Sequence, residues 1–446
     1  MSRAAMKTLK TFLLPLFLLF TTLLTACGGG GGSSPTAATY SVVYSANGST
    51  GGAVPSDTKA YAASSTATVL GNTGALVKTG YVFTGWNTAA NGSGTAYAAG
   101  ASLAVGSGSV TLYAAWVRQF TQVTTLAGTA GSGGSADGTG TAALFNGPSG
   151  VATGGTNLYV ADSSSGTIRK LAIATGAVTT LAGSADGTGY VDGTGAAARF
   201  YLPNGITTDG TNLYVADSGN STIRKVVIAT GVVSTLAGTA RSEGSTDGTG
   251  TAARFKNPGG VATDGTNLYV TDGGNSTIRK VVIATGVVTT LVGTAGSSGS
   301  TDDTGAAARF DSPKGITTDG TNLYVTDGGN STIRKVVIAT GVVTTLAGTA
   351  GSSGSTDGTG TGALFGYPQG ITTDGSNLYV TDALNTIRKV VIATGVVTTL
   401  AGAAGSNGSA DGTGAAARFY GPNGVTTDGT NLYVADTFNS TIRKIQ

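Results

Sequence analysis

The chain repeats one four-residue string six times at a nearly constant interval. Asn-Leu-Tyr-Val begins at Asn157, Asn212, Asn267, Asn322, Asn377 and Asn431, and the successive intervals are 55, 55, 55, 55 and 54 residues. A second string, Thr-Ile-Arg-Lys, follows each copy and begins at Thr167, Thr222, Thr277, Thr332, Thr386 and Thr441. A period of this length is typical of solenoids and propellers, in which each unit buries its apolar face against the next.

Each period predicts four short strands. In the third copy these are residues 260–263, 267–271, 277–284 and 287–292. Asp-Gly-Thr and Ala-Thr-Gly separate them as tight turns, with glycine where a positive φ is needed. β-branched residues occupy both faces of the strands, which suits sheets buried between neighbouring sheets. Six such sheets predict an all-β, six-bladed β-propeller over residues 120–446.

The two ends of the repeat array predict how the ring closes. The array opens at residues 122–127 with a fourth strand that has no first three, and it ends at residues 441–446 with a third strand that has no fourth. We therefore expect the N-terminal strand to complete the last blade, because closure removes exposed strand edges.

Three strings within each repeat resemble the NHL repeat. In the second copy they are the Pro-x-Gly-Ile string at residues 203–206, Asn-Leu-Tyr-Val-Ala-Asp at 212–217 and Asn-Ser-Thr-Ile-Arg-Lys at 220–225. The resemblance covers about three quarters of the chain and implies a six-bladed propeller. It says little about function, because propellers include enzymes, binding proteins and scaffolds.

Residues 39–117 lie outside the repeat and form a separate predicted module. Gly-Tyr-x-Phe-x-Gly-Trp-Asn within residues 78–95 and Leu-Tyr-Ala-x-Trp within 110–116 resemble the Listeria–Bacteroides repeat, also called the internalin B-repeat. The resemblance implies a small β-grasp-like module that serves as a spacer or adhesion unit in surface proteins. A small domain needs large side chains for its core, so we expect the aromatic residues to form it: Tyr81, Phe83, Trp86, Tyr113 and Trp116.

The N-terminus predicts export and a lipid anchor. Three basic residues precede the apolar run 12–24, which is too short to span a bilayer comfortably and is typical of a signal peptide over residues 1–26. Leu-Thr-Ala-Cys at 24–27 resembles a bacterial lipobox and implies lipidation of Cys27; the alternative is an ordinary signal peptide. Residues 27–38 then form a Gly/Ser-rich tether. The predicted location is the cell envelope, at the outer membrane or the extracellular face of the cell membrane.

The balance of charge argues against a nucleic-acid partner. Removal of the three basic residues of the signal peptide leaves 22 Lys+Arg against 22 Asp+Glu. Nucleic-acid binding requires a basic face. Cys27 is the only cysteine of the sequence, so stability must come from packing without disulfides.

The sequence contains no histidine and a single glutamate, Glu243. The absence of histidine excludes a Ser-His-Asp triad, and it also excludes the lyase chemistries of NHL relatives that use histidine as a metal ligand or as an acid or base. We therefore predict no catalytic residues, no metal site, no cofactor and no enzymatic activity.

Two aspartates and one phenylalanine recur in each repeat. The first aspartate follows Tyr-Val and precedes the repeated arginine, which predicts an ion pair or an Asx turn: Asp162, Asp217, Asp272, Asp327, Asp382 and Asp436. The second lies in the Asp-Gly-Thr-Gly loops, where turn formation is preferred over calcium binding: Asp137, Asp186, Asp192, Asp247, Asp302, Asp303, Asp357 and Asp411. The phenylalanines are expected to pin these loops to the blades: Phe145, Phe200, Phe255, Phe310, Phe365 and Phe419.

Variation among otherwise near-identical blades gives the best functional hypothesis. The residues after each phenylalanine and after each following proline differ in chemistry, and they precede the innermost strands, so they should surround one mouth of the central channel. The loops between second and third strands should emerge on the same face, and they also vary, with Leu384 and Phe438 as apolar outliers. We predict that this loop face binds a ligand through Tyr201, Lys256, Asp311, Lys314, Tyr367, Gln369, Tyr420 and Phe438. Unselected drift of the loops is the alternative.

These features together predict a noncatalytic binding or scaffold protein of the cell surface. Its predicted partners are a protein or a glycan, and the membrane through the lipid on Cys27. The alternatives are a metal-dependent envelope hydrolase or lyase, and a purely structural display protein.

Overall fold

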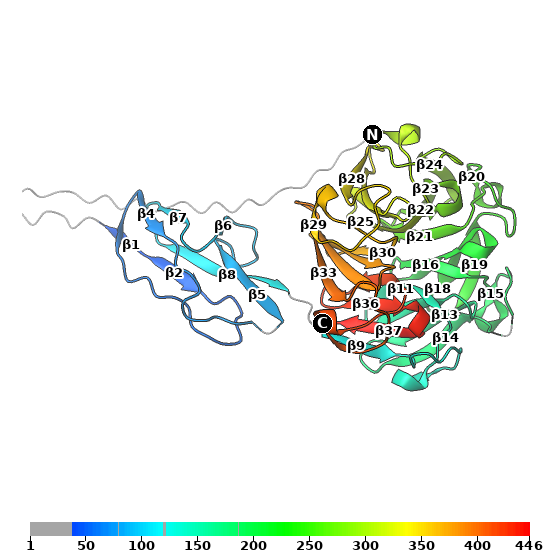
Figure 1. Cartoon of the computed structure of the whole chain (residues 1–446), viewed down its shortest axis with the longest axis horizontal. Helices are drawn as coiled ribbons and strands as arrows, with labels where there is room; N and C mark the ends of the chain where they lie inside the picture. Colours follow the sequence, from blue (N-terminus) through cyan, green and yellow to red (C-terminus); the bar gives the residue numbers. More distant parts are fainter. Residues whose placement is uncertain (1–37, 79, 119–121, 186) are drawn as a thin grey trace, which may run out of the picture. The chain divides into compact units, whose positions relative to one another are not determined.

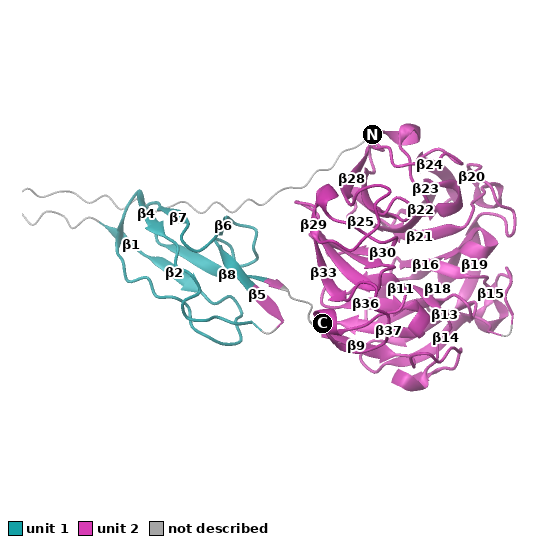
Figure 2. Ribbon diagram, viewed as in Figure 1, with its two compact units in different colours: residues 1–78, 83–116 teal, residues 79–82, 117–446 magenta. Residues whose placement is uncertain are grey.

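The computed structural model describes residues 38–78, 80–118, 122–185 and 187–446. The predicted signal peptide, Cys27 and nearly all of the tether lie outside these residues. The described chain contains strands and three-residue 3-10 turns but no longer helix, so the all-β prediction is confirmed. None of its helical turns has the length and apolar character that a membrane span requires. Contacts divide the chain into two compact units, residues 1–78 with 83–116 and residues 79–82 with 117–446 (Figure 2).

The smaller unit contains eight described strands in three sheets. Its main sheet has the order β2-β8-β5-β6, with β2 parallel to β8, and the pairs β1-β3 and β4-β7 form two smaller sheets. The strands are β1 (Thr39–Tyr40), β2 (Val42–Ser45), β3 (Tyr61–Ala62), β4 (Ser65–Thr68), β5 (Tyr81–Asn87), β6 (Ala96–Tyr97), β7 (Ser102–Val105) and β8 (Val110–Arg118).

Trp86 is the centre of the core of this unit. Its side chain is completely buried, and its indole N–H donates a hydrogen bond to the carbonyl oxygen of Leu70 at 2.8 Å. The rings of Tyr44 and Phe83 meet it edge to face, with centroid distances of 4.6 and 5.1 Å. The prediction of an aromatic core is therefore confirmed for Trp86, and Phe83 and Trp116 pack against the core cluster.

Tyr81 and Tyr113 do not belong to this core, and the prediction was wrong for both. Alternate residues of a strand point to opposite faces. In β8 the inward positions are taken by Leu112 and Ala114, both fully buried, and Tyr113 between them is only half-buried. Tyr44, near the start of the unit, supplies a ring that the sequence argument had not assigned to the core.

The larger unit consists of six described sheets arranged around their first strands (Figure 1). The first strands are β11 (Pro148–Gly154), β16 (Pro203–Thr208), β21 (Pro258–Thr263), β25 (Pro313–Thr318), β30 (Pro368–Thr373) and β35 (Pro422–Thr427). The second strands are β12 (Asn157–Asp162), β17 (Asn212–Asp217), β22 (Asn267–Asp272), β26 (Asn322–Asp327), β31 (Asn377–Asp382) and β36 (Leu432–Asp436).

The outer strands complete each sheet in antiparallel order. The third strands are β13 (Thr167–Ala172), β18 (Thr222–Val227), β23 (Thr277–Val282), β27 (Thr332–Val337), β32 (Thr386–Val391) and β37 (Thr441–Ile445). The fourth strands are β14 (Ala177–Gly183), β19 (Val232–Ala237), β24 (Val287–Val292), β28 (Val343–Ala347), β33 (Val396–Gly402) and β9 (Gln122–Ala127). We number the sheets as blades 1 to 6 in the chain order of their first strands.

A fifth, two-residue strand lies outside the fourth strand in five blades, which the sequence argument missed. These strands are β10 (Gly138–Thr139), β15 (Gly193–Thr194), β20 (Gly248–Thr249), β29 (Gly358–Thr359) and β34 (Gly412–Thr413). Blade 4 has a single bridge, Thr304 to Val342, at this place. The extra strand carries the Asp-Gly-Thr-Gly loop back along the blade edge and shields that edge.

The predicted closure of the ring is confirmed. β9, from the start of the array, pairs with β37, from its end, and the sheet of blade 6 has the order β34-β9-β37-β36-β35. A hydrophobic cluster also joins blade 6 to blade 1, with Tyr433 and Ile442 packed together with Phe145 and Leu158. The array is therefore continuous between its last and first blades.

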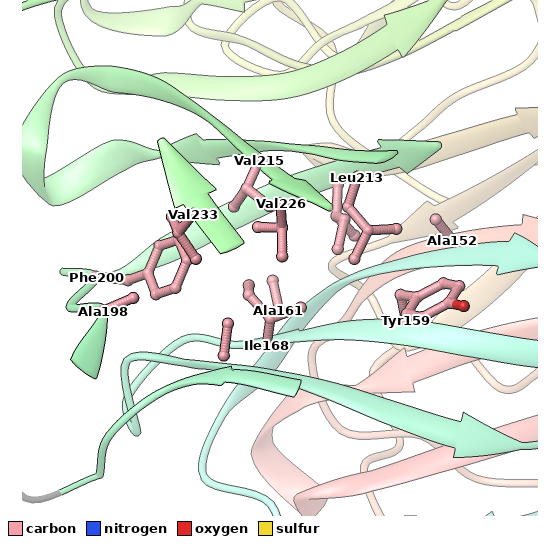
Figure 3. Packing of buried hydrophobic residues seen from close by; sticks show 12 residues of the cluster. Ala152, Tyr159, Ala161, Ile168, Ala198, Phe200, Leu213, Val215, Val226 and Val233 are labelled. Carbon is pink, nitrogen blue, oxygen red and sulfur yellow. The ribbon is translucent and has the colours of Figure 1, made fainter. Parts of the chain in front are cut away.

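Each blade packs on the next through one buried cluster, and Figure 3 shows the cluster between blades 1 and 2. Tyr159 and Ile168 of blade 1 belong to the same cluster as Phe200 and Val226 of blade 2, and all four side chains are buried. Residues of the second and third strands thus bury both of their faces, as the near-continuous β-branched sequence predicts. Burial of a side chain of this size contributes roughly 1.5–3 kcal/mol.

Candidate functional site

The central channel opens at one end into a mouth formed by the residues that follow the six prolines. A cavity of about 180 Å³ lies here, and its rim includes Asn204, Gly259, Lys314, Gln369 and Asn423. Each proline begins a first strand, where the missing N–H is tolerated. Strand pairing then shifts, as between Pro203 and Ile206, and such a bulge re-aims the side chains of the two intervening residues.

A glycine follows each of these rim residues because neighbouring blades approach very closely there. A Cβ on Gly205 would lie 2.5 Å from the carbonyl oxygen of Gly259 in the next blade, and a Cβ on Gly260 would lie 2.6 Å from that of Lys314. The same contact recurs around the ring and includes Gly424 of blade 6 with Ser149 of blade 1. Side chains can therefore vary at the rim residue but not at the glycine beside it.

We call the side of the propeller on which this mouth opens the mouth face. The structure places the eight predicted site residues on it in three groups. Lys314 and Gln369 line the channel mouth. Phe438 lines an adjoining pocket of about 390 Å³ between blades 6 and 1. The others line neither cavity and lie on the loops that lead into the first strands: Tyr201, Lys256, Asp311, Tyr367 and Tyr420.

Two pairs among these residues make direct contacts. The Lys314 ammonium lies 5.5 Å from the centroid of the Tyr367 ring, a cation–π contact between blades 4 and 5. The rings of Tyr420 and Phe438 meet edge to face, with centroids 5.0 Å apart. Phe438 is nevertheless 65% exposed. Within the described part of the chain, no hydrogen bond, ion pair, ring–ring or cation–π contact joins Tyr201, Lys256 or Asp311 to another predicted site residue.

Two loops of each blade reach the mouth face, one before the first strand and one between the second and third strands. In blades 2 to 6 a large residue on one of these loops lies against a glycine on the other. In blade 2, Tyr201 lies against Gly219, where a Cβ would be 2.5 Å from the tyrosine ring. In blades 5 and 6 the glycine lies on the loop before the first strand, at Gly366 and Gly421. The large side chain then lies on the loop between the second and third strands. The pairs are Tyr201 with Gly219, Lys256 with Gly274, Asp311 with Gly329, Leu384 with Gly366 and Phe438 with Gly421.

The repeated aspartates and arginines form a buried network below this face. In blade 3, Arg279 is fully buried and binds Asp272 at 2.8 Å and Asp247 at 2.7 Å. Its guanidinium carbon lies 5.2 Å from the centroid of the Phe255 ring, and its N–H groups also donate to the carbonyl oxygens of Arg254 and Thr246. All six blades repeat this arrangement, which confirms the predicted ion pair and the role of the phenylalanines.

The loop aspartates have a different role from the predicted one. They do more than form turns: Asp247 binds Arg279 and also accepts hydrogen bonds from the N–H and hydroxyl groups of Thr290. Asp137, Asp192, Asp302, Asp357 and Asp411 act in the same way in their blades. Asp186 lies outside the described residues. Within the described chain, no group of three His, Cys, Asp or Glu side chains could hold a metal ion.

Burial strongly affects the inner aspartate of the network. It raises the pKa of Asp217 to about 6, and hydrogen bonds from Asn220 and the charge of Arg224 oppose that rise. The carboxylate pairs with Arg224 at 2.8 Å and also accepts the backbone N–H of Tyr201 at 2.8 Å. This last bond holds the loop residue of the mouth face, so the buried network positions the variable residues above it.

Blade 5 shows the structural consequence of the single 54-residue interval. Its loop between the second and third strands is one residue shorter, and Arg388 lies 3.8 Å from Asp382 instead of about 3 Å. In blade 3 the side-chain amide of Asn275 donates to Asp272, whereas in blade 5 the Asn385 side chain accepts the N–H of Gly421 in blade 6.

The prediction of the site omitted several polar side chains that line the pocket beside Phe438. Asn146, Asn204, Asn423, Ser163 and Ser164 all belong to its wall. The positions of the three asparagines, after a phenylalanine or a proline, already marked them as members of the variable set. Their convergence on one pocket depends on the contact of blade 6 with blade 1, which the sequence alone does not display.

Comparison with known proteins agrees with the two-unit organisation of the chain. Residues 40–115 match the Listeria-Bacteroides repeat domain. The protein SUPPRESSOR OF QUENCHING 1 of Arabidopsis thaliana is 31% identical over 282 residues, which are 59% of this chain and 26% of the relative. NHL repeat-containing protein 2 of Homo sapiens is 38% identical over 144 residues, which are 30% of this chain and 20% of the relative. The chain thus spans about a quarter or less of the length of these relatives.

Two solved structures share the propeller fold. A Bacteroides thetaiotaomicron protein of unknown function has a TM-score of 0.57 and 23% identity, over 77% of this chain and 79% of that chain. An auxiliary nutrient binding protein of the same organism has a TM-score of 0.56 and 17% identity, over 75% of this chain and 79% of that chain. The larger unit is therefore a β-propeller whose sequence is similar to NHL repeat proteins, and residues 40–115 match the Listeria-Bacteroides repeat domain.

Proposed function

We propose that this chain is a noncatalytic binding or scaffold protein of the cell envelope, and that the mouth face of its propeller holds the ligand, a protein or a glycan. One observation carries the proposal: the blades share their interior and differ at the mouth. The residues after the six prolines are Ser149, Asn204, Gly259, Lys314, Gln369 and Asn423, five different residue types in six copies. Binding surfaces are commonly built from variable loops on a rigid scaffold.

The opposite face of the propeller argues against general drift as the cause. There the turn between the first and second strands reads Asp-Gly-Thr or Asp-Gly-Ser in five blades, beginning at Asp209, Asp264, Asp319, Asp374 and Asp428. These turns join the first and second strands of a blade and are exposed, as are the mouth loops, which lead into the first strands or join the second to the third. The exposed turns of the opposite face have remained near-copies while the mouth loops have diverged, and this contrast supports a function for the mouth.

A metal-dependent hydrolase or lyase is the second candidate that the sequence left open. It would need loop aspartates free to bind a metal, but Asp247 and its five equivalents hold the buried arginines and a threonine of the fourth strand. The sequence also has no histidine to act as an acid or base. Both observations favour binding over catalysis.

The proposed envelope location rests on the N-terminus and on the kind of protein that shares the fold. Lipidation of Cys27 would attach the chain to a membrane, and residues 27–38 would separate the folded units from it. One structural neighbour is described as an auxiliary nutrient binding protein, and this supports a binding role without naming a ligand. The near-zero charge after cleavage argues against nucleic acid.

Cross-linking capture from the native cell envelope tests the proposal. The bait is the protein itself, compared with a variant in which Tyr201, Lys256, Tyr367 and Tyr420 are all replaced by alanine, each in calcium and in chelator. We expect a partner that only the natural protein captures, with or without calcium. Equal capture by both proteins, or no capture by either, would contradict binding at the mouth and favour structural display. Turnover that chelator abolishes would favour the hydrolase.

A further inference from the structure

The pocket between blades 6 and 1 differs in chemistry from the rest of the mouth. Among the described residues that line it, none is charged, and its wall consists of amides, hydroxyls, glycine and one aromatic ring: Asn146, Gly147, Ser149, Ser163, Ser164, Asn204, Asn423, Thr437, Phe438 and Ser440. Its volume of about 390 Å³ falls within the range of roughly 300–1,000 Å³ that is typical of sites for small ligands.

Several polar groups of this pocket are not used by the fold. Within the described chain, the side-chain amides of Asn146, Asn204 and Asn423 make no hydrogen bond, and neither do the hydroxyls of Ser163 and Ser164. Other hydroxyls here are already engaged: Thr437 donates to the carbonyl oxygen of Pro148 at 2.7 Å. The pocket therefore offers both donors and acceptors to a ligand, because a primary amide and a hydroxyl each supply both.

Phe438 gives the pocket an exposed apolar surface. It is 65% exposed, the largest exposed fraction among the exposed large apolar side chains of the described residues. The ring of Tyr420 contacts the Phe438 ring edge to face, with centroids 5.0 Å apart, and the Phe438 ring also lies against Gly421. The equivalent residue is glycine in blades 2, 3 and 4 and serine in blade 1, so the fold does not require a large side chain at this position.

A threonine that is present in blades 3 to 5 is absent around this pocket. In blade 3 the Thr271 hydroxyl accepts the N–H of Gly260 and donates to the carbonyl oxygen of Lys314, both at 2.6 Å. Blades 6, 1 and 2 have alanine there, at Ala435, Ala161 and Ala216. The side-chain hydroxyl that engages the rim backbone in one half of the mouth is thus missing from the half that contains the pocket.

We propose that this pocket binds an uncharged glycan, with one sugar ring stacked on Phe438 and its hydroxyl groups bonded to Asn204, Asn423 and the neighbouring serines. A pyranose ring has an apolar C–H face and a rim of groups that both donate and accept hydrogen bonds, which matches an exposed aromatic ring beside unpaired amides. An anionic ligand would lack a cationic partner here. A flat protein surface would need a contact of about 800 Å² per partner, much more than a concave pocket provides. The inference rests on the proposed binding function and specifies its ligand class.

Calorimetric titration of the full-length protein with defined oligosaccharides tests the proposal. The probes are neutral cello-, malto-, manno- and xylo-oligosaccharides, with oligogalacturonate as the acidic comparison. We expect at least one neutral probe to bind, and Phe438→Ala to weaken it by about tenfold, as expected for the loss of an aromatic contact. Phe438→Trp should retain binding, and Asn423→Ala should weaken it by roughly three- to tenfold.

Two matched controls separate the pocket from other aromatic or apolar surfaces. Leu384→Ala changes the residue of blade 5 that corresponds to Phe438, and Tyr190→Ala removes an aromatic side chain that is 52% exposed elsewhere on the propeller. Both should bind the neutral probe as the natural protein does. Equal melting temperatures for all variants would show that the affinities report on the pocket and not on folding.

Three results would overturn the proposal. One is the absence of heat from every neutral probe, the second is a preference for oligogalacturonate, and the third is binding that neither Phe438→Ala nor Asn423→Ala weakens. Capture of a protein on the mouth face, together with no glycan binding, would overturn the glycan and leave the binding function intact. Loss of all capture in the envelope experiment would instead contradict the proposed function itself.

Discussion

The two faces of the propeller have the same architecture but not the same sequence variation. On one face the turns between first and second strands are nearly identical, and the Asp209 carboxylate accepts the backbone N–H groups of Thr211 and Asn212. On the mouth face, the residues after each phenylalanine and each proline differ from blade to blade. The connections on both faces are exposed to solvent. The difference therefore shows that sequence variability follows the end of the channel at which a loop lies, and not exposure to solvent.

The contacts of each face explain the difference in physical terms. In blades 2 to 6 the turn aspartates hold their turns, and in all six blades the buried Asp–Arg–Asp network below the mouth holds the loops. Both therefore constrain the sequence of the copies in which they occur. A mouth residue such as Tyr201 is hydrogen-bonded through its backbone, by its N–H to Asp217 and its carbonyl to Gly219. Its side chain can therefore differ between blades, provided that a small residue such as Gly219 faces a large one.

Deletion of residues 120–128 should have the largest effect on this comparison, because it removes β9 and opens blade 6. The unpaired edge of β37 would then be available to other molecules, and we expect aggregation. Sedimentation velocity would show it. A deletion of equal length in the tether, residues 28–36, is the control and should leave the association state unchanged. A monodisperse protein after loss of β9 would mean that closure is not needed.

Substitution of one network arginine should cause the next largest loss. Arg279→Ala leaves the fully buried Asp272 without its cation, which should reduce the free energy of unfolding by about 3–5 kcal/mol. Urea denaturation measures this. Lys280→Ala, at the neighbouring half-buried position, should change stability by about 0.5 kcal/mol or less. Similar values for the two variants would show that the network contributes no more than a surface residue.

The turn aspartates should give a smaller effect that depends on pH. Burial opposes ionisation of Asp209 and Asp264, but hydrogen bonds from Asn212 and Asn267, and from nearby backbone N–H groups, outweigh it and lower each pKa to about 2. A folded-state pKa below the unfolded value stabilises the protein above about pH 4, and this contribution is lost as the pH falls from 4 to 2. Because the groups are largely exposed, we expect less than about 1 kcal/mol from each.

A double variant isolates this contribution. Asp209→Asn with Asp264→Asn keeps the shape of both side chains and removes both charges. Urea denaturation from pH 2 to pH 6 should show the natural protein more stable than the variant above pH 4, with the difference vanishing toward pH 2. A difference that is constant with pH would exclude the charge as its source.

The sequence was sufficient for the architecture because the relevant information is local and repeated. The period gave the blades, and the incomplete repeats at the two ends gave the pairing of β9 with β37. The role of the loop aspartates could not be predicted, because Asp247 meets an arginine 32 residues later across the sheet. The fifth strands are too short, at two residues, to show an alternating pattern.

Only part of the candidate site was accessible to the same reasoning. Position after a proline identified Lys314 and Gln369 as rim residues, but the pocket beside Phe438 combines side chains from both ends of the array. Which residues share that pocket depends on how blade 6 meets blade 1. It also depends on small residues such as Gly147, which makes room for Ser164. Neither condition has a signature in one repeat.

The unfolding free energy of the variant with alanine at Tyr201, Lys256, Tyr367 and Tyr420 tests most directly whether the mouth is independent of the fold. Surface substitutions away from buried contacts change stability by about 0.5 kcal/mol or less each. We therefore predict a total change of no more than about 2 kcal/mol for four substitutions, with the cooperativity of unfolding unchanged. A loss as large as that of Arg279→Ala would contradict the account, because the variable residues would then serve the fold.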